Sequence, residues 1–278
     1  IPIRGSFSAH VAKELAQASV VSWLPTLILT VGTQTGVLYV YGSQGASETG
    51  YYYIAFTIFS VIASIPYSIW QVAFPVLSGM ADARKRFTWQ WTKLGMVFTV
   101  PLVTVLMLGS KQVLGLFGPD FLAANTAVLL LLPTAVFMMI VNGIQTLCYA
   151  YGQYRNVLII GLSTNIPRLI LYILLVPSMG SDGAAIAFLG GILVGLIACV
   201  FIARKIDLHF SIKQVSLIIA VPAIVGTASY FLNLHWIIGI LLVVGISSLI
   251  YFKAKIMTRN EVEGLISSLS LKTSLKAK

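Results

Sequence analysis

The chain has 278 residues, of which 58% are hydrophobic and 9% are charged, and its formal net charge is +10. Soluble domains average about 25% charged residues, so this composition excludes an ordinary soluble protein. The sequence contains no predicted soluble domain that could carry the positive charge. It therefore predicts contact with the anionic headgroups of a lipid bilayer and no binding of nucleic acid.

Long runs without charge predict membrane-spanning helices, because a helix needs about 20 apolar residues to cross the hydrocarbon core. In chain order these runs, of which one contains a single Arg, are Val20–Tyr41, Thr49–Ala81, Leu94–Ser110, Phe121–Tyr154, Asn156–Ser181, Gly183–Ala203 and Gln214–Phe252. The last would form a helix about 58 Å long against a core of about 30 Å, so we expect it to fold back at Asn233-Leu234-His235. The sequence thus predicts an all-α polytopic membrane helix bundle of about eight transmembrane helices.

The basic residues indicate the orientation of this bundle. All 18 Lys and Arg residues except Lys111 and Arg168 fall in every second connection or near the two termini. Lys and Arg concentrate on the cytoplasmic side of membrane proteins. We therefore expect a multi-pass protein of the cytoplasmic (plasma) membrane with both termini in the cytoplasm.

The chain divides into four predicted segments. Residues 1–19 predict an interfacial cytoplasmic helix, because apolar residues recur there at helical spacing beside charged ones. Residues 20–204 hold six predicted helices, 205–256 hold two additional ones, and 257–278 form a basic, Ser-rich cytoplasmic tail. The chain begins at Ile1 and not at Met, so we expect a fragment of a longer protein.

The distribution of acidic residues argues against catalysis. The eight Asp and Glu residues fall in loops or at helix ends, without a paired carboxylate, a His cluster or a metal-ligand spacing. Membrane enzymes that act on phosphoryl or glycosyl groups use carboxylates, usually with a metal ion. We therefore expect a protein that is not an enzyme and needs no cofactor.

Arg168 is the one charge in the middle of a predicted span. Placing an Arg there costs at least about 2.5–3.5 kcal/mol, so something must compensate. One interpretation is an anion site facing an aqueous cavity, because a guanidinium matches phosphate or carboxylate. The other is a structural role, in which helix-end carbonyls accept from the guanidinium or the side chain extends to the interface. Asn165, one helical turn earlier, belongs to the same candidate site.

Two further polar groups lie inside predicted spans. Asn142, Gln145 and Thr146 share one helical face, which predicts either hydrogen bonds between helices or the wall of a hydrophilic cavity. Gln34 belongs to a polar face of the first helix that is too polar for lipid. The candidate substrate-binding residues are Arg168, Asn142, Gln145, Asn165 and Gln34.

Three stretches carry a family resemblance. They are Gly50–Ala55 with Ile65-Pro66 and Phe74–Ser78; Leu116–Phe121; and Ala150–Gln153 with Asn165, Pro177, Gly180 and Gly183–Ala187. In this order and spacing they resemble the C-terminal portion of polysaccharide and lipid-linked oligosaccharide flippases, such as the O-antigen flippases. These belong to the multidrug/oligosaccharidyl-lipid/polysaccharide exporter superfamily.

The resemblance implies the C-terminal lobe of a two-lobe exporter, with a missing N-terminal lobe. Such proteins move polyprenyl-diphosphate-linked saccharides across the membrane by alternating access. Arg168 departs from the pattern, which has an uncharged residue there. Two alternatives remain open: a cation-coupled drug antiporter of the same superfamily, whose acidic residues would lie in the missing lobe, and a membrane-embedded glycan enzyme.

Overall fold

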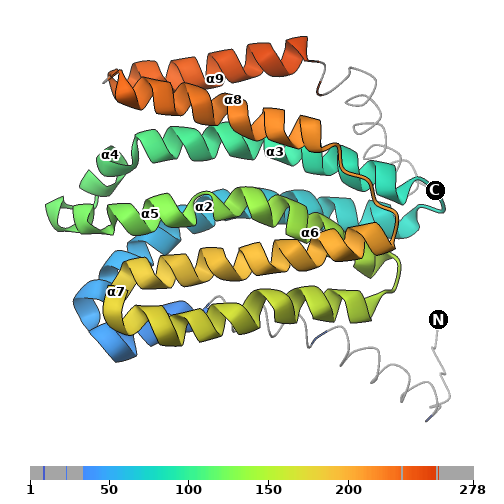
Figure 1. The fold of residues 1–278 in the computed structure, drawn as a ribbon, viewed down its shortest axis with the longest axis horizontal. Coiled ribbons are helices and arrows are strands. Elements are labelled where there is room, and N and C mark those ends of the chain that lie inside the picture. The colour runs from blue at the N-terminus through green and yellow to red at the C-terminus, as the bar shows by residue number, and fades with distance from the viewer. Residues whose placement is uncertain (1–8, 10–22, 24–33, 233, 255, 257–278) are drawn as a thin grey trace, which may run out of the picture.

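The computed structural model describes residues 9, 23, 34–232, 234–254 and 256. In this part of the chain, long helices lie side by side in one bundle and no strand is present (Figure 1). The prediction of an all-α polytopic bundle is therefore confirmed. The predicted interfacial helix at 1–19, apart from residue 9, and the predicted tail at 257–278 lie outside the described residues.

The helices follow one another with short connections. In chain order they are α2 (Ala46–Gly79), α3 (Arg84–Leu108), α4 (Ser110–Gly115), the 3-10 helix η1 (Pro119–Ala124), α5 (Asn125–Leu131), α6 (Thr134–Ala150), α7 (Tyr154–Lys205), α8 (Ile212–Phe231) and α9 (Trp236–Lys253). Residues 34–44, before α2, are also helical. They form the end of the first predicted span, most of which lies outside the described residues.

Helix α7 crosses the bundle twice. Its 52 residues would extend about 78 Å as one helix, far more than a bilayer needs. Gly180 breaks it with a non-helical φ of 55° and ψ of −130°, and Figure 1 shows the two arms running back along each other. Six helices in the described residues are long and apolar enough to span a membrane. Since one of them crosses twice, they make seven crossings. The predicted break near Ser181 is confirmed, and α8 ends at Phe231 while α9 begins at Trp236, on either side of the other predicted break.

The run predicted as a single helix over Phe121–Tyr154 is interrupted. The structure divides it into η1, α5 and α6, with a break at Leu132-Pro133. Pro133 has no N–H to continue the ladder of helical hydrogen bonds, which explains the break. Gly152, with a φ of 68°, then turns the chain into α7.

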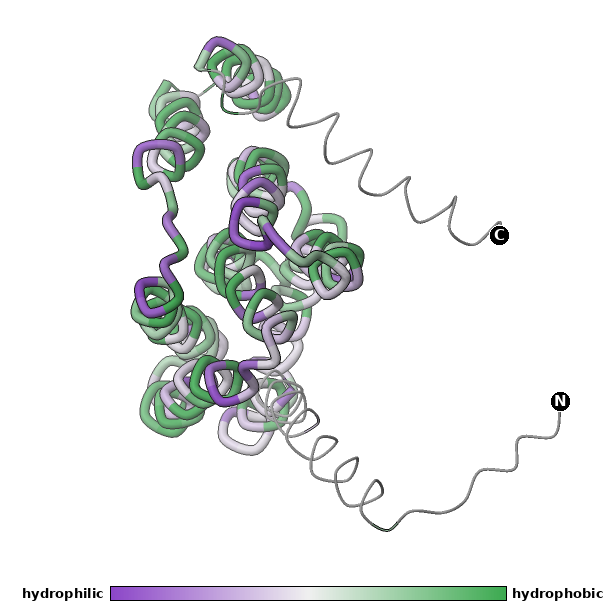
Figure 2. Tube along the Cα trace, turned by 90° about the vertical axis from the view of Figure 1, so that its right-hand side faces the viewer, coloured by the Kyte–Doolittle hydropathy of each residue, from purple (hydrophilic) through white to green (hydrophobic). Residues whose placement is uncertain are grey.

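The α2–α3, α6–α7 and α7–α8 connections lie at one end of the bundle, opposite the bend of α7 and the α8–α9 turn (Figure 1). These three connections and the helix ends beside them carry most of the described basic residues: Arg84, Lys85, Arg86, Arg155, Arg204, Lys205 and Lys213. Seen end-on, hydrophilic segments lie at the ends of several helices (Figure 2). The structure thus gathers the basic connections at one end of the bundle, as the sequence predicts.

The bundle has a dense centre and a loosely attached edge. In the apolar window of Pro119–Ala150, 67% of residues are buried, against 22% in those of α8 and of α9. At the centre, Trp70 Nε1 of α2 donates to the carbonyl oxygen of Met139 in α6 at 3.1 Å. Helices α8 and α9 pack on each other and on α3, and lie at the edge of the bundle (Figures 1 and 2).

Two side chains hold the bend of α7, and we call them the clasp. Gln44 Nε2 donates to the carbonyl oxygens of Val176 at 3.1 Å and Pro177 at 2.8 Å. Glu48 Oε2 accepts from the backbone N–H of Ser181 at 2.9 Å. The end of the first arm and the start of the second leave backbone groups without helical partners, and the clasp satisfies some of them. It ties the start of α2 to the α7 hairpin.

Candidate functional site

A line of polar side chains follows one outward face of α2. We call it the hydroxyl stripe: Tyr53, Thr57, Ser60, Ser64, Tyr67, Ser68 and Gln71. At 100° per residue these seven positions fall within a sector of about 100°, so they share one face of the helix. All are exposed except Thr57, which is half-buried. A membrane-spanning helix with this outward face suits contact with water or with a polar ligand.

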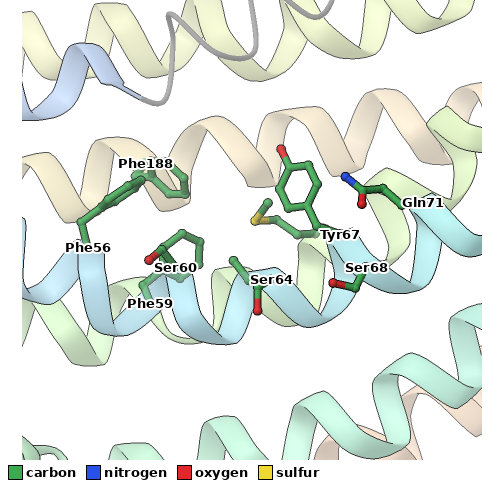
Figure 3. Close-up of a pocket in the computed structure, with 10 residues that line it drawn as sticks. Phe56, Phe59, Ser60, Ser64, Tyr67, Ser68, Gln71 and Phe188 are labelled. Carbon is green, nitrogen blue, oxygen red and sulfur yellow. The ribbon is translucent and has the colours of Figure 1, made fainter.

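The stripe borders a pocket of about 490 Å³. Five of the pocket residues belong to the stripe, as Figure 3 shows for Ser60, Ser64, Tyr67, Ser68 and Gln71. The others are apolar: Phe56, Phe59, Ala63, Met138 of α6 and Phe188 of α7. The volume falls within the range of about 300–1,000 Å³ that is typical of small-molecule sites.

The serine hydroxyls of the stripe are oriented by their own helix. Ser60 Oγ donates to the carbonyl oxygen of Thr57 at 2.8 Å, and Ser64 Oγ donates to that of Val61 at 2.6 Å. A hydroxyl has one proton and two acceptor lone pairs. Because the proton is used within the helix, the exposed oxygen of each serine presents acceptor capacity to the pocket.

An aromatic cluster connects the pocket to Arg168. The Phe188 ring lies 5.6 Å from that of Phe56 and 5.2 Å from that of Phe59, both edge-to-face. On the same ring, the guanidinium carbon of Arg168 lies 4.0 Å from the centroid. Phe188 therefore contacts the buried cation and also lines the pocket, and a charge on the ring face is a favourable cation–π geometry.

Arg168 is 1% exposed and so is not at the pocket surface in this conformation. Its Nη1 donates to Asn165 Oδ1 at 3.2 Å, while its buried Nε has no hydrogen-bond partner. Asn165 Nδ2 in turn donates to the carbonyl oxygen of Gly161 at 2.9 Å. The side chain is thus stabilised by an amide and an aromatic face, and none of these partners carries a charge.

The two arms of α7 approach closely around Arg168. A Cβ on Gly191 would lie 2.5 Å from the carbonyl oxygen of Thr164 and 2.7 Å from Cβ of Arg168. Such distances require a residue without a side chain. Gly191 therefore allows the second arm to cover Arg168 and to hold Phe188 against it.

The structure brings Arg168 and Asn165 together, but not the other candidate residues. Asn142 and Gln145 lie on α6, whose contribution to the pocket is Met138, and neither lines it. Asn142 is half-buried with an Nδ2 that has no partner, and Gln145 is 7% exposed. Gln34 is exposed at the start of the described helical segment.

Sequence reasoning missed the hydroxyl stripe. It lies inside a run that reads as uniformly apolar, because serine and tyrosine lower the average hydropathy little. A signal was nevertheless present: Ser60, Ser64 and Ser68 recur at intervals of four, with Tyr67 and Gln71 on the same face. Placing the polar residues of each span on a helical wheel would have found it.

The comparisons with known proteins include a curated relative and a solved structure. No family model matches the chain. A curated protein named "Probable flippase AglR", from Haloferax volcanii, is 26% identical over 191 residues, which cover 64% of this chain and 37% of the relative. The solved "Lipid II flippase MurJ, inward closed conformation" matches with a TM-score of 0.71 at 19% identity, covering 92% of this chain and 58% of MurJ.

The chain spans about a third of the length of this relative and under two thirds of MurJ. At 19% identity, the match to MurJ is evidence for the fold alone. The likeness to flippases that the sequence motifs indicate is confirmed in sequence by AglR and in fold by MurJ. This chain is a multi-pass membrane protein with the fold of a flippase and with sequence similarity to one.

Proposed function

We propose that this chain is one lobe of a flippase that moves polyprenyl-diphosphate-linked saccharides across the cytoplasmic membrane. The hydroxyl stripe carries the proposal, because a transporter must present polar groups along a membrane-spanning path. The similarity to two proteins named as flippases supports it. Their names also favour transport over enzymatic chemistry.

A second lobe completes the proposed transporter. Alternating access works by rocking one half of such a protein against the other around a central site. We infer that the partner lobe, which the motifs predict on the N-terminal side, faces the hydroxyl stripe of α2. Residues 1–278 alone should then fail to restore export of surface polysaccharide in a flippase-deficient cell, whereas the two-lobe protein should restore it.

The basic end of the bundle is proposed to face the cytoplasm. Single cysteines test this orientation at exposed positions of opposite ends: Ser43 and Ser178 near the clasp, and Ser78 near the α2–α3 connection. A membrane-impermeant maleimide added to intact cells should label the first two. Labelling of Ser78→Cys should require permeabilisation, and labelling of all three from outside would contradict the orientation.

Coupling through carboxylates inside this lobe receives no support from the described residues. Their five acidic side chains all lie near helix ends or in connections: Glu48, Asp82, Asp120, Asp182 and Asp207. A drug antiporter of the same superfamily would then carry such groups in its other lobe. The similarity to two proteins named as flippases favours the lipid-linked substrate.

Arg168 is proposed to act on the pocket through Phe188. In the described conformation Arg168 contacts the ring of Phe188, which lines the pocket, and does not line the pocket itself. Its contact with an anionic group of the substrate is therefore a prediction for another state of the transporter. Arg168→Lys keeps the charge but loses the planar fork that stacks on an aromatic ring, and should retain part of the transport. Arg168→Gln should lose more of it.

The decisive experiment reconstitutes the two-lobe protein into proteoliposomes with a fluorescent polyprenyl-diphosphate saccharide. With native protein, labelled lipid from both leaflets should become accessible to a quencher added outside the vesicles. Ser64→Leu should slow this transfer between leaflets at equal protein content. A matched substitution on the apolar edge, Val244→Leu, should leave it unchanged. An exchange rate equal to that of protein-free vesicles would overturn the proposed function.

A further inference from the structure

We propose that the pocket beside α2 is a subsite for an uncharged sugar ring of the lipid-linked substrate, and that the diphosphate binds elsewhere. This inference rests on the proposed function and adds which part of the substrate this lobe holds. It follows from the hydrogen-bonding character of the pocket, its aromatic wall and its depth.

The charge of the pocket is the first argument. None of the ten residues that line it is ionised at neutral pH: it has three serines, a tyrosine, a glutamine and five apolar residues. Phosphate groups are recognised by Arg, Lys, helix N-termini or metal ions, which supply positive charge and several donors. Among the described residues, Arg168 is the cation that contacts a lining residue, and it is 1% exposed and lies against Phe188. The described lining of the pocket therefore lacks what a diphosphate requires.

The direction of the serine hydrogen bonds is the second argument. Ser60 and Ser64 give their protons to backbone carbonyls and present acceptor lone pairs to the pocket. An ionised phosphate has only acceptor oxygens, so it has no proton to donate to the serine oxygens. A sugar hydroxyl is also a donor, so it can donate to them, while Gln71 and Tyr67 offer both donor and acceptor groups.

The composition of the wall is the third argument. Phe56, Phe59 and Phe188 form one contiguous aromatic cluster beside the serines. Sites for small polar molecules combine an apolar, often aromatic, lining with a few polar groups that fix orientation. A pyranose ring offers the matching surface, since its C–H faces are apolar and its edge carries hydroxyls.

The depth of the pocket fits transit. Ser64 lies 18 residues from the first residue of α2 and 15 from the last, or about 27 Å and 22 Å along the helix axis. The subsite therefore lies near the middle of the span, where polar groups of the protein can hydrogen-bond a saccharide in transit. Polar groups at this depth lower the barrier for the sugar.

The test compares one polyprenyl diphosphate with and without its sugar. The full two-lobe protein, in a detergent without a sugar headgroup, is titrated with undecaprenyl diphosphate and with undecaprenyl-diphosphoryl-N-acetylglucosamine, and bound lipid is quantified by native mass spectrometry. Native protein should bind the sugar-bearing lipid about tenfold more tightly, which corresponds to a few net hydrogen bonds. The double variant Ser60→Ala/Ser64→Ala should lose this preference and bind the sugar-free lipid unchanged.

Two controls keep the result interpretable. Ser178 is an exposed serine of α7 whose Oγ donates to the carbonyl oxygen of Leu175 in the same three-residue pattern, outside the pocket. Ser178→Ala should keep the preference, as should Ser64→Thr, which retains a hydroxyl. Equal binding of both lipids to native protein, or a preference that survives in the double variant, would overturn the subsite. Weakened binding of both lipids by that variant would also overturn it. If neither lipid bound the native protein, the proposed function itself would be overturned.

Discussion

The side of the bundle formed by α2 and α7 differs from the edge formed by α8 and α9. Along α2 the exposed residues include hydroxyls and an amide, and behind them the arms of α7 enclose a buried cation. Along α8 and α9 the exposed residues are mostly aliphatic or aromatic, such as Ile224 at 66% and Leu241 at 67%. Both regions are long apolar helices, but their outward faces are suited to different surroundings.

This difference shows that low burial has two meanings in a membrane bundle. An exposed apolar face fits lipid, whereas an exposed polar face fits water, a ligand or another polypeptide. The space around the helices also differs between the two regions. Gly191 admits almost no extra atom between the arms of α7, whereas a methyl group added at Gly245 of α9 would have nothing within 4 Å.

The largest expected effect comes from placing a charge on each outward face. Val244 lies at the middle of α9 and is 48% exposed, and Ser64 lies near the middle of α2. Val244→Arg should cost about 2.5–3.5 kcal/mol of membrane insertion, because its guanidinium would meet hydrocarbon. Ser64→Arg should insert almost normally if its surroundings are aqueous. Protease protection and yield in the membrane fraction measure both, and equal losses would remove the distinction between the two faces.

An intermediate effect is expected from adding one methyl group at two glycines. Gly191→Ala would press against the carbonyl of Thr164 and the stem of Arg168, and should destabilise the bundle by about 1–3 kcal/mol. Gly245→Ala meets open space and should be neutral or stabilising by up to about 1 kcal/mol, because alanine favours the helix. Thermal unfolding in detergent compares the two. A stable Gly191→Ala protein would mean that the arms of α7 are not held as described.

Comparing the sequence with the structure separates what periodicity and charge can predict from what they cannot. The break at Asn233-Leu234-His235 was predictable, because a single helix of that length does not fit a bilayer. Arg168 was noticeable as a lone charge in an apolar run. Its stacking on Phe188 was not predictable, since it depends on how the second arm of α7 folds back over the first. The hydroxyl stripe was encoded in α2, but only angular position distinguishes it from hydroxyls scattered around a helix.

The smallest expected effect tests how α9 is attached to the rest of the edge. Tyr251 is buried, and its hydroxyl donates to the carbonyl oxygen of Ile218 in α8 at 2.6 Å. Tyr251→Phe should lower the free energy of unfolding by about 0.5–1.5 kcal/mol. Tyr230→Phe, at a residue that is 70% exposed, is the matched control and should change nothing. If both variants unfold like the native protein, packing alone attaches α9.

The clasp has a consequence for the order of events during synthesis. Gln44 and its acceptor Val176 are 132 residues apart, so at about 5–20 residues per second the donor is made roughly 7–26 s before its partner. Until then the partners of Gln44 and Glu48 in the bend of α7 have not been synthesised, and the clasp cannot form. We expect chains released after residue 160 to be cleared from the membrane faster than chains released after residue 205, because only the longer ones can close the clasp. Pulse-chase measurement of the two lifetimes checks this, and equal lifetimes would show that the late contact gives no protection.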